Sequence, residues 1–230
     1  MSDEKKLLCL ITGASGSGKT SIASNLKENI LKNVTEHRFL NGEISSQNRT
    51  FIKIVLLHQD NYFTKPFLPY IERKDDSYEN HSGIDWDRLM TDIQLHASSK
   101  HRIVIIVEGH LLGDATAKFQ QFENDFDTIA VLVTCQKDTC KRRRLERRYR
   151  NEDEKNVLAN YIDTFVWPSF LKYGVDAMHS LRTPGIDSSA CENSNGKSTI
   201  LEIDSETSSL TANVEEILNH IYEILDCMGK

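Results

Sequence analysis

The chain has 230 residues, of which 39% are hydrophobic, and its formal net charge at neutral pH is −6. That length predicts a single domain over residues 1–230, and the acidic balance argues against nucleic acid as the main partner. No apolar run approaches the roughly 20 residues that span a bilayer. The N-terminus lacks the apolar segment of a signal peptide, and the five scattered cysteines indicate free thiols in a reducing compartment. We therefore expect a cytoplasmic protein without a membrane partner. The sequence does not determine the oligomeric state, which is either a monomer or a small homo-oligomer.

The first element in chain order is an apolar run, Leu7–Ile11, which predicts a strand. Next comes a segment that matches G-x-x-x-x-G-K-[ST] in full, and a helical pattern follows it. In this context backbone N–H groups and the helix N-terminus bind phosphate, Lys19 reaches the β- and γ-phosphates, and Thr20 holds Mg²⁺. The alternative is a glycine-rich turn that binds nothing. The predicted nucleotide-binding residues here are Gly13, Ala14, Ser15, Gly16, Ser17, Gly18, Lys19, Thr20 and Ser21.

Further apolar runs predict four more strands, separated for the most part by helical patterns. This alternation predicts an α/β fold of the P-loop NTPase type, with a doubly wound, parallel, five-stranded sheet. Polar segments at 33–50 and 181–198 are expected to be loops, and Pro168 is expected to kink or break a helix. The four runs are Phe51–Leu57, Ile103–Val107, Ile129–Val133 and Ile200–Ile203.

Two acidic residues follow predicted strands, at the edge where open α/β sheets bind their ligands. Asp60 comes shortly after Phe51–Leu57, and Glu108 directly follows Ile103–Val107. Both would flank the phosphate loop. Phosphoryl transfer needs one carboxylate to deprotonate the attacking hydroxyl and further acids to hold the metal. The alternative is that each acid only caps the helix that follows it.

A basic run occupies residues 141–148, where six of the eight positions are Lys or Arg. On a helix, Arg143, Arg144 and Arg147 share one face. Because the run follows a predicted strand of a P-loop chain, we expect an Arg-rich helical lid over about residues 137–160, whose arginines neutralise the transferring phosphate. The alternative is a solvated helix face.

Several segments beyond the phosphate loop occur in the same order as in one known group of enzymes. They are Gln59-Asp-Asn-Tyr-Phe63, Ser77-Tyr-Glu79, Val107-Glu-Gly-His-Leu-Leu112, Cys140-Lys-Arg-Arg-Arg144 with Arg147 and Tyr149, and Tyr161-Ile-Asp-Thr-Phe-Val-Trp-Pro168 with Leu171-Lys-Tyr173. With them the chain resembles the nicotinamide riboside kinases, within the wider uridine-kinase-like group. The resemblance covers about residues 5–32, 51–178 and 200–228.

The resemblance implies a kinase that uses ATP and Mg²⁺ to phosphorylate the 5′-hydroxyl of nicotinamide riboside, and of nicotinic acid riboside, in NAD synthesis. Asp60 matches the general base, and Lys19 and Arg147 are the further catalytic residues. Thr20, Asp60 and Glu108 match residues that bind Mg²⁺ or lie close to it. Arg143 and Arg147 match nucleotide contacts of the lid.

The same resemblance implies an acceptor pocket. Tyr78 would stack on the nicotinamide ring, Glu79 would hold the ribose hydroxyls, and Tyr149 would form a second aromatic wall. A cationic ring would gain cation–π attraction there that a neutral uracil would not. Asn61 and Glu79 stand where the family usually has Asp. The implied substrate residues are Asp60, Asn61, Tyr62, Phe63, Tyr78, Glu79, Arg144 and Tyr149.

Three other functions stay open on the sequence. The nearest is a uridine/cytidine kinase. The second is a P-loop nucleotide-binding regulatory protein with no small substrate. It needs no nucleoside pocket, so Asp60 and the aromatic pair argue against it. The third is a nucleic-acid binder that uses the Arg-rich helix, which the net charge of −6 disfavours.

Overall fold

We analysed a computed structural model of the chain, which describes residues 6–40, 52–98, 102–175, 178 and 198–227. Its centre is a five-stranded sheet in the order β2-β3-β1-β4-β5, in which every pair of neighbours is parallel. The predicted parallel five-stranded sheet is therefore confirmed. The strands are β1 (Lys6–Gly13), β2 (Lys53–His58), β3 (Ile103–Gly109), β4 (Phe126–Thr134) and β5 (Ser198–Asp204).

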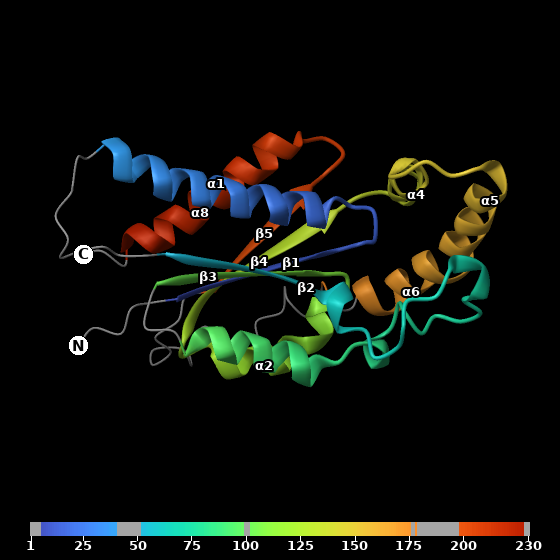
Figure 1. Cartoon of the computed structure of the whole chain (residues 1–230), viewed down its shortest axis with the longest axis horizontal. Coiled ribbons are helices and arrows are strands. Elements are labelled where there is room, and N and C mark those ends of the chain that lie inside the picture. Colours follow the sequence, from blue (N-terminus) through green and yellow to red (C-terminus); the bar gives the residue numbers. More distant parts are fainter. Residues whose placement is uncertain (1–5, 41–51, 99–101, 176–177, 179–197, 228–230) are drawn as a thin grey trace.

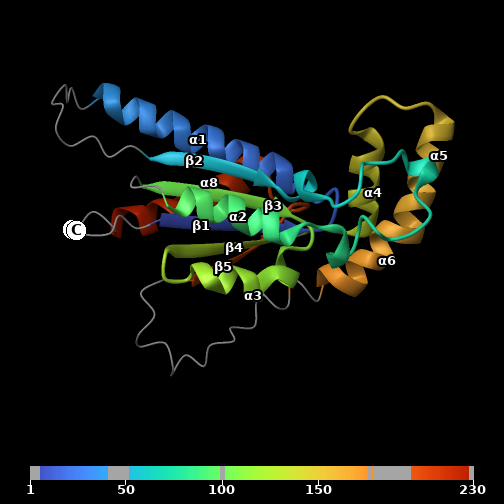
Figure 2. The same cartoon turned by 60° about the horizontal axis from the view of Figure 1, so that its bottom comes forward.

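Helices cover both faces of the sheet, as Figures 1 and 2 show. Helices α1 (Lys19–Leu40) and α8 (Leu210–Cys227) cover one face, and α2 (Trp86–Ala97) and the short α3 (Thr116–Phe119) lie on the other. The side chains of β1 alternate between two buried clusters, so that Leu7 packs toward α1 and α8 while Leu8 packs toward α2. Burial on both faces explains the nearly unbroken apolar strand sequences and confirms the doubly wound arrangement.

The remaining helices lie beyond one end of the sheet. Figure 1 shows α4 (Lys137–Glu146), α5 (Glu152–Tyr161) and α6 (Trp167–Ser169) to the right of the strands. A capping box begins α5: Asn151 Oδ1 accepts from the Glu154 N–H at 2.9 Å, and Glu154 Oε2 accepts from the Asn151 N–H at 3.1 Å. The predicted lid region is thus two helices joined by a short connection.

Short helical segments connect these elements. Those of the 3₁₀ type are η1 (Gln59–Tyr62), η2 (Tyr70–Glu72), η3 (His81–Gly83), η4 (Leu112–Ala115) and η5 (Gln120–Phe122). Two π-helical segments, η6 (Ile162–Val166) and η7 (Phe170–Gly174), flank α6.

Two local predictions need correction. Helix α1 continues through Leu40, whereas the sequence predicted a loop from residue 33, because no Gly or Pro interrupts residues 19–40. Residues 41–51 and 179–197 lie outside the described residues, and Ser198 already belongs to β5. Pro168 does not break its helix. The hydrogen-bond pattern widens to i→i+5 on both sides of Trp167–Ser169, which accommodates the missing N–H of proline.

Two further expectations concern the cysteines and membrane-spanning segments. Cys9, Cys135 and Cys140 are free thiols, and the other two cysteines lie outside what is described of side chains. No helix in the described part of the chain is both long enough and apolar enough to cross a membrane.

Candidate active site

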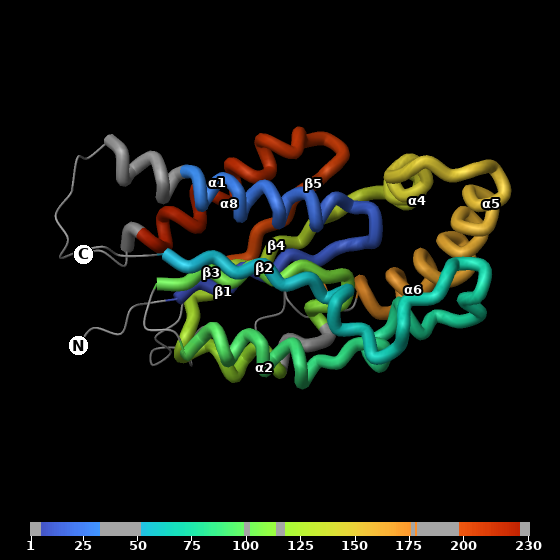
Figure 3. The backbone as a smooth tube through the Cα atoms, viewed as in Figure 1, coloured from blue at the N-terminus to red at the C-terminus, as the bar shows by residue number. Residues whose placement is uncertain are grey.

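The phosphate loop joins β1 to α1 at the end of the sheet nearest the lid helices, and the backbone trace in Figure 3 shows the chain turning back there. The loop has the conformation that its glycines permit. Gly18 has φ +104°, which is sterically costly for any residue with a Cβ. Lys19 begins α1, and its Nζ, buried in the loop, donates to the Ala14 carbonyl oxygen at 2.8 Å. Burial lowers the pKa of Lys19, and the negative charges of Glu108 and Asp60 oppose that shift.

Gly16 brings the lid close to the phosphate loop. It has φ +95°, and a Cβ at this position would lie 2.5 Å from the carbonyl oxygen of Cys140 on α4. Only glycine therefore allows α4 to pack against the loop at this distance. Arg143, one turn further along α4, adds a polar link: its Nη1 lies 3.3 Å from the Ser17 carbonyl oxygen and its Nη2 lies 2.7 Å from that of Ser205.

The two strand-end acids lie beside the phosphate loop, as predicted. Glu108, near the end of β3, is buried; its Oε1 lies 3.3 Å from Thr20 Oγ1 and 2.8 Å from His58 Nδ1. Asp60 is in the 3₁₀ turn after β2 and is exposed to the open site. The buried Gln59 fixes this turn, since its Oε1 accepts from the Leu111 N–H at 3.2 Å and its side chain fills the space beside Gly109.

These residues fit a nucleotide with Mg²⁺. The loop leads into the N-terminus of α1, where the first N–H groups of a helix have no intrahelical partner, and Ser17 Oγ is buried without a hydrogen-bond partner. The Thr20 hydroxyl and the Glu108 carboxylate offer the oxygen ligands that Mg²⁺ prefers. No group of three or more His, Cys, Asp or Glu side chains that could hold a metal occurs among the described residues. Mg²⁺ would thus take other ligands from phosphate and water, as it commonly does.

A cavity of about 700 Å³ surrounds the phosphate loop. It lies between the loop, the lid arginines and the turn that leads from β5 into α8, and it is lined by both strand-end acids. The sequence reasoning did not find the contribution of that last turn, because the predicted strand and helix around it carried no nucleotide motif. The residues that this turn and the start of α8 add are Ser205, Ser208, Leu210 and Asn213.

A second cavity, of about 360 Å³, adjoins the first, and we call it the acceptor cavity. It is lined by the segment between β2 and α2, including Phe63, Tyr78 and Glu79, and by four arginines of the lid region: Arg144, Arg147, Arg148 and Arg150. Asp60 is at the junction, because it lines both cavities. The residues common to the two cavities are Ser15, Asp60, His110, Arg144 and Arg147.

The three lid arginines occupy different positions relative to these cavities. Arg143 lines only the first cavity, around the phosphate loop, whereas Arg144 and Arg147 line both cavities. Arg144 Nη2 lies 3.3 Å from the Tyr70 hydroxyl, and its Nη1 is buried with no partner. Arg147, which follows α4, is exposed. The structure therefore brings the predicted arginines to one site.

In the acceptor cavity, Glu79 is a buried carboxylate. Its Oε1 accepts from the Tyr161 hydroxyl at 3.3 Å, and its Oε2 lies 3.7 Å from His110 Nε2. Burial raises the pKa of Glu79 to about 7 against the opposing charges of Arg144 and Arg73. Burial likewise lowers the pKa of His110 to about 4, so this imidazole is neutral at pH 7. Sequence reasoning missed His110, although its place directly after Glu108-Gly109 could have indicated it.

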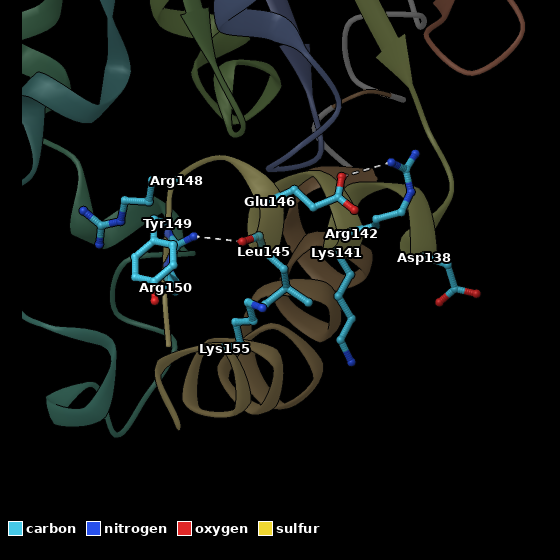
Figure 4. Close-up of a pocket in the computed structure, with 9 residues that line it drawn as sticks. All are labelled: Asp138, Lys141, Arg142, Leu145, Glu146, Arg148, Tyr149, Arg150 and Lys155. Atoms are coloured by element: carbon cyan, nitrogen blue, oxygen red, sulfur yellow. Dashed lines mark hydrogen bonds and ion pairs between the residues drawn. The ribbon is translucent and has the colours of Figure 1, made fainter. Parts of the chain in front are cut away.

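Three predicted substrate residues do not line the acceptor cavity. Tyr62 is buried against α2, where its hydroxyl donates to Asp92 Oδ2 at 2.7 Å. Asn61 is exposed and lines neither cavity. Tyr149 is 96% exposed. It follows α4 and lines another surface cavity, of about 590 Å³, together with Lys155. Figure 4 shows the residues that line this cavity. In this conformation Tyr149 therefore does not face Tyr78 across a substrate.

Fold and phosphate loop together define an α/β P-loop NTPase. A family model described as an AAA domain matches residues 9–163, more than half of the chain, and the chain belongs to that family. Among curated proteins, no sequence matches the chain.

Solved structures are similar along nearly the whole chain. A candidate kinase from Chloroflexus aurantiacus is 14% identical, with a TM-score of 0.50 over 94% of this chain and 98% of the other. A gluconokinase from Sinorhizobium meliloti is 13% identical (TM-score 0.47; coverage 98% and 96%), and a shikimate kinase from Bacteroides thetaiotaomicron is 11% identical (TM-score 0.44; coverage 94% and 98%). At these identities the likeness bears on the fold alone.

Proposed function

We propose that this protein is a single-domain, Mg·ATP-dependent kinase that phosphorylates a hydroxyl group of a small molecule. The observation that carries the proposal is the pair of adjoining cavities with Asp60 at their junction. A carboxylate at such a junction can contact a hydroxyl on one side and lie close to a phosphate on the other. The structural neighbour from Chloroflexus aurantiacus is itself described as a kinase, which agrees with this reaction class.

Each residue has a role in this proposal. The phosphate-loop N–H groups and Lys19 hold the nucleotide phosphates, and Thr20 and Glu108 hold Mg²⁺. The metal, when bound, neutralises charge that develops on the phosphates. Asp60 orients the acceptor hydroxyl and accepts its proton. Arg144 and Arg147 stabilise negative charge in the transition state and help to exclude water from the site.

For the acceptor, we propose the 5′-hydroxyl of nicotinamide riboside or of nicotinic acid riboside, on the strength of the sequence resemblance. Tyr78 and Glu79 support this proposal because both line the acceptor cavity. The expected aromatic sandwich with Tyr149 would need the connection between α4 and α5 to move. Arg73 already lies against the rings of Phe67, Tyr70 and Tyr78, so cation–π attraction does not by itself favour a cationic ring.

The test is Mg·ATP-dependent phosphorylation of a panel of nucleosides by the purified protein. We expect kcat/KM for the better pyridine riboside to exceed those for uridine and cytidine. Asp60→Asn should abolish most of the turnover. The matched control is Asp87→Asn, which should leave turnover unchanged because Asp87 lies on α2 in an exposed ion pair with Lys118 of α3. A tenfold preference for a pyrimidine nucleoside would instead identify a uridine/cytidine kinase. ATP binding without transfer to any acceptor would favour the regulatory alternative.

A further inference from the structure

Arg73 is a buried cation in the wall of the acceptor cavity for which the proposed phosphoryl transfer gives no role. We propose that Arg73 is a specificity-determining residue that recognises a carboxylate carried by the acceptor molecule. This inference rests on the proposed function, and it deepens that proposal by naming the chemical class of the acceptor.

The position of Arg73 is set by aromatic rings. Its side chain is 6% exposed, and its guanidinium carbon lies 4.0 Å from the ring centroid of Phe67, 4.2 Å from that of Tyr78 and 4.5 Å from that of Tyr70. Its Nε donates to the Leu68 carbonyl oxygen at 2.9 Å. A guanidinium held in this way is pre-organised, because stacking on rings leaves it little rotamer freedom.

Among the described residues, no carboxylate forms an ion pair with the guanidinium of Arg73, and Arg73 Nη2 is buried with no hydrogen-bond partner. The nearby acid is Glu79, which also interacts with Arg144 and whose pKa of about 7 leaves it only partly ionised at neutral pH. The neutral phenol of Tyr161 also interacts with Arg73, since its oxygen accepts a hydrogen bond from the guanidinium and its ring centroid lies 5.3 Å from the guanidinium carbon. Buried charges are normally paired, so an incoming anion would supply a missing partner.

Phosphate of the nucleotide does not account for this arginine. Arg144 and Arg147 line both cavities and are placed to contact the transferring phosphate. Arg73 lines only the acceptor cavity. It also comes from a different part of the chain, next to η2 rather than on the lid. The anion that Arg73 recognises must therefore belong to the acceptor.

A carboxylate suits this place better than an uncharged group. The planar guanidinium fork binds a carboxylate through two parallel hydrogen bonds. A carboxamide in the same position would present one N–H₂ group toward N–H donors and would add no compensating charge. Of the two pyridine ribosides, the acid should therefore be the better substrate, because its ring carries the carboxylate.

Arg73 could instead serve only to fold its own loop, and the experiment separates the two roles. We would measure kcat/KM for nicotinic acid riboside against nicotinamide riboside, and for 5-carboxyuridine against uridine as a second pair differing by a carboxylate. In the wild type we expect the acid of the pyridine pair to be favoured by about tenfold, the scale of one charge-assisted hydrogen bond. In Arg73→Gln the ratio should fall to about one, while Arg73→Lys should keep part of it because it keeps the charge.

Arg88→Gln is the matched control, since Arg88 is also stacked on a tyrosine, 5.2 Å from the Tyr62 ring centroid, but on α2 outside the acceptor cavity. It should leave every ratio unchanged. A merely structural Arg73 would lower kcat/KM for acid and amide equally, and that outcome overturns the inference. A wild-type preference for the amide overturns it without any variant, even if Arg73→Gln fails to fold. If the wild type phosphorylates no nucleoside, the proposed function itself fails.

Discussion

Glu79→Gln should stabilise the protein, increasingly so as the pH rises. Glu79 is 7% exposed, and burial raises the pKa of its carboxyl group from an ordinary 4.5 to about 7. A carboxyl group with a raised pKa resists ionisation in the folded state, so its contribution to the free energy of unfolding falls as the pH rises from about 4.5 through about 7. A shift of this size corresponds to a loss of about 3 kcal/mol in the wild type above that range. The substituted glutamine side chain would keep an acceptor for the Tyr161 hydroxyl without the charge.

The assay is urea unfolding of wild type and Glu79→Gln at several values between about pH 5 and about pH 8. The difference in unfolding free energy should grow across this range to about 3 kcal/mol. The facing His110, whose pKa is lowered to about 4, destabilises the protein as the pH falls below its ordinary 6.5. It is present in both proteins, so the difference reports mainly the carboxyl group. Glu72→Gln, at an exposed carboxylate of the same segment, should follow the wild type. A difference that stays flat, or that grows toward acid, would refute the reasoning.

The remaining predictions concern the transfer site. Asp60→Asn should keep the fold and lower kcat by about 10² to 10⁴, the usual contribution of a general base; near-normal turnover on the best acceptor would rule out this role. Lys19→Ala should weaken Mg·ATP binding and nearly abolish transfer, and calorimetry that finds unchanged affinity would contradict the phosphate-loop assignment. Arg147→Ala should lower kcat more than it raises the KM for ATP, because its exposed charge is expected to act mainly in the transition state; an effect on KM alone would indicate uniform binding instead.

The sheet could be predicted from the sequence because its strands are buried on both faces. Leu7–Ile11 and Ile103–Val107 are unbroken apolar runs, and the glycine motif fixes what lies between the first strand and its helix. The ends of helices were harder to predict. Helix α1 runs to Leu40 through a polar sequence that contains no Gly or Pro to mark its end. Pro168 shows the converse, because a nominal helix breaker is accommodated by π-helical turns on each side.

The nucleotide side of the site was more predictable than the acceptor side. Lys19, Thr20 and Glu108 follow from a local motif and a strand end. The acceptor cavity is built instead by an irregular segment whose conformation depends on long-range contacts, such as the hydrogen bond that the Tyr161 hydroxyl donates to Glu79 Oε1 at 3.3 Å. Arg73 is a lone arginine in such a segment, and no sequence pattern identifies it before the fold brings four aromatic rings around it.

The most direct test of the central claim is phosphorus-31 NMR of a reaction containing the protein, Mg²⁺, ATP and the best nucleoside of the panel. The account predicts that the γ-phosphate signal of ATP is replaced by one phosphomonoester signal, coupled to the 5′ protons of the nucleoside, with ADP formed in equal amount. It would be contradicted if ATP remained intact, or if ADP appeared together with inorganic phosphate and no phosphorylated nucleoside.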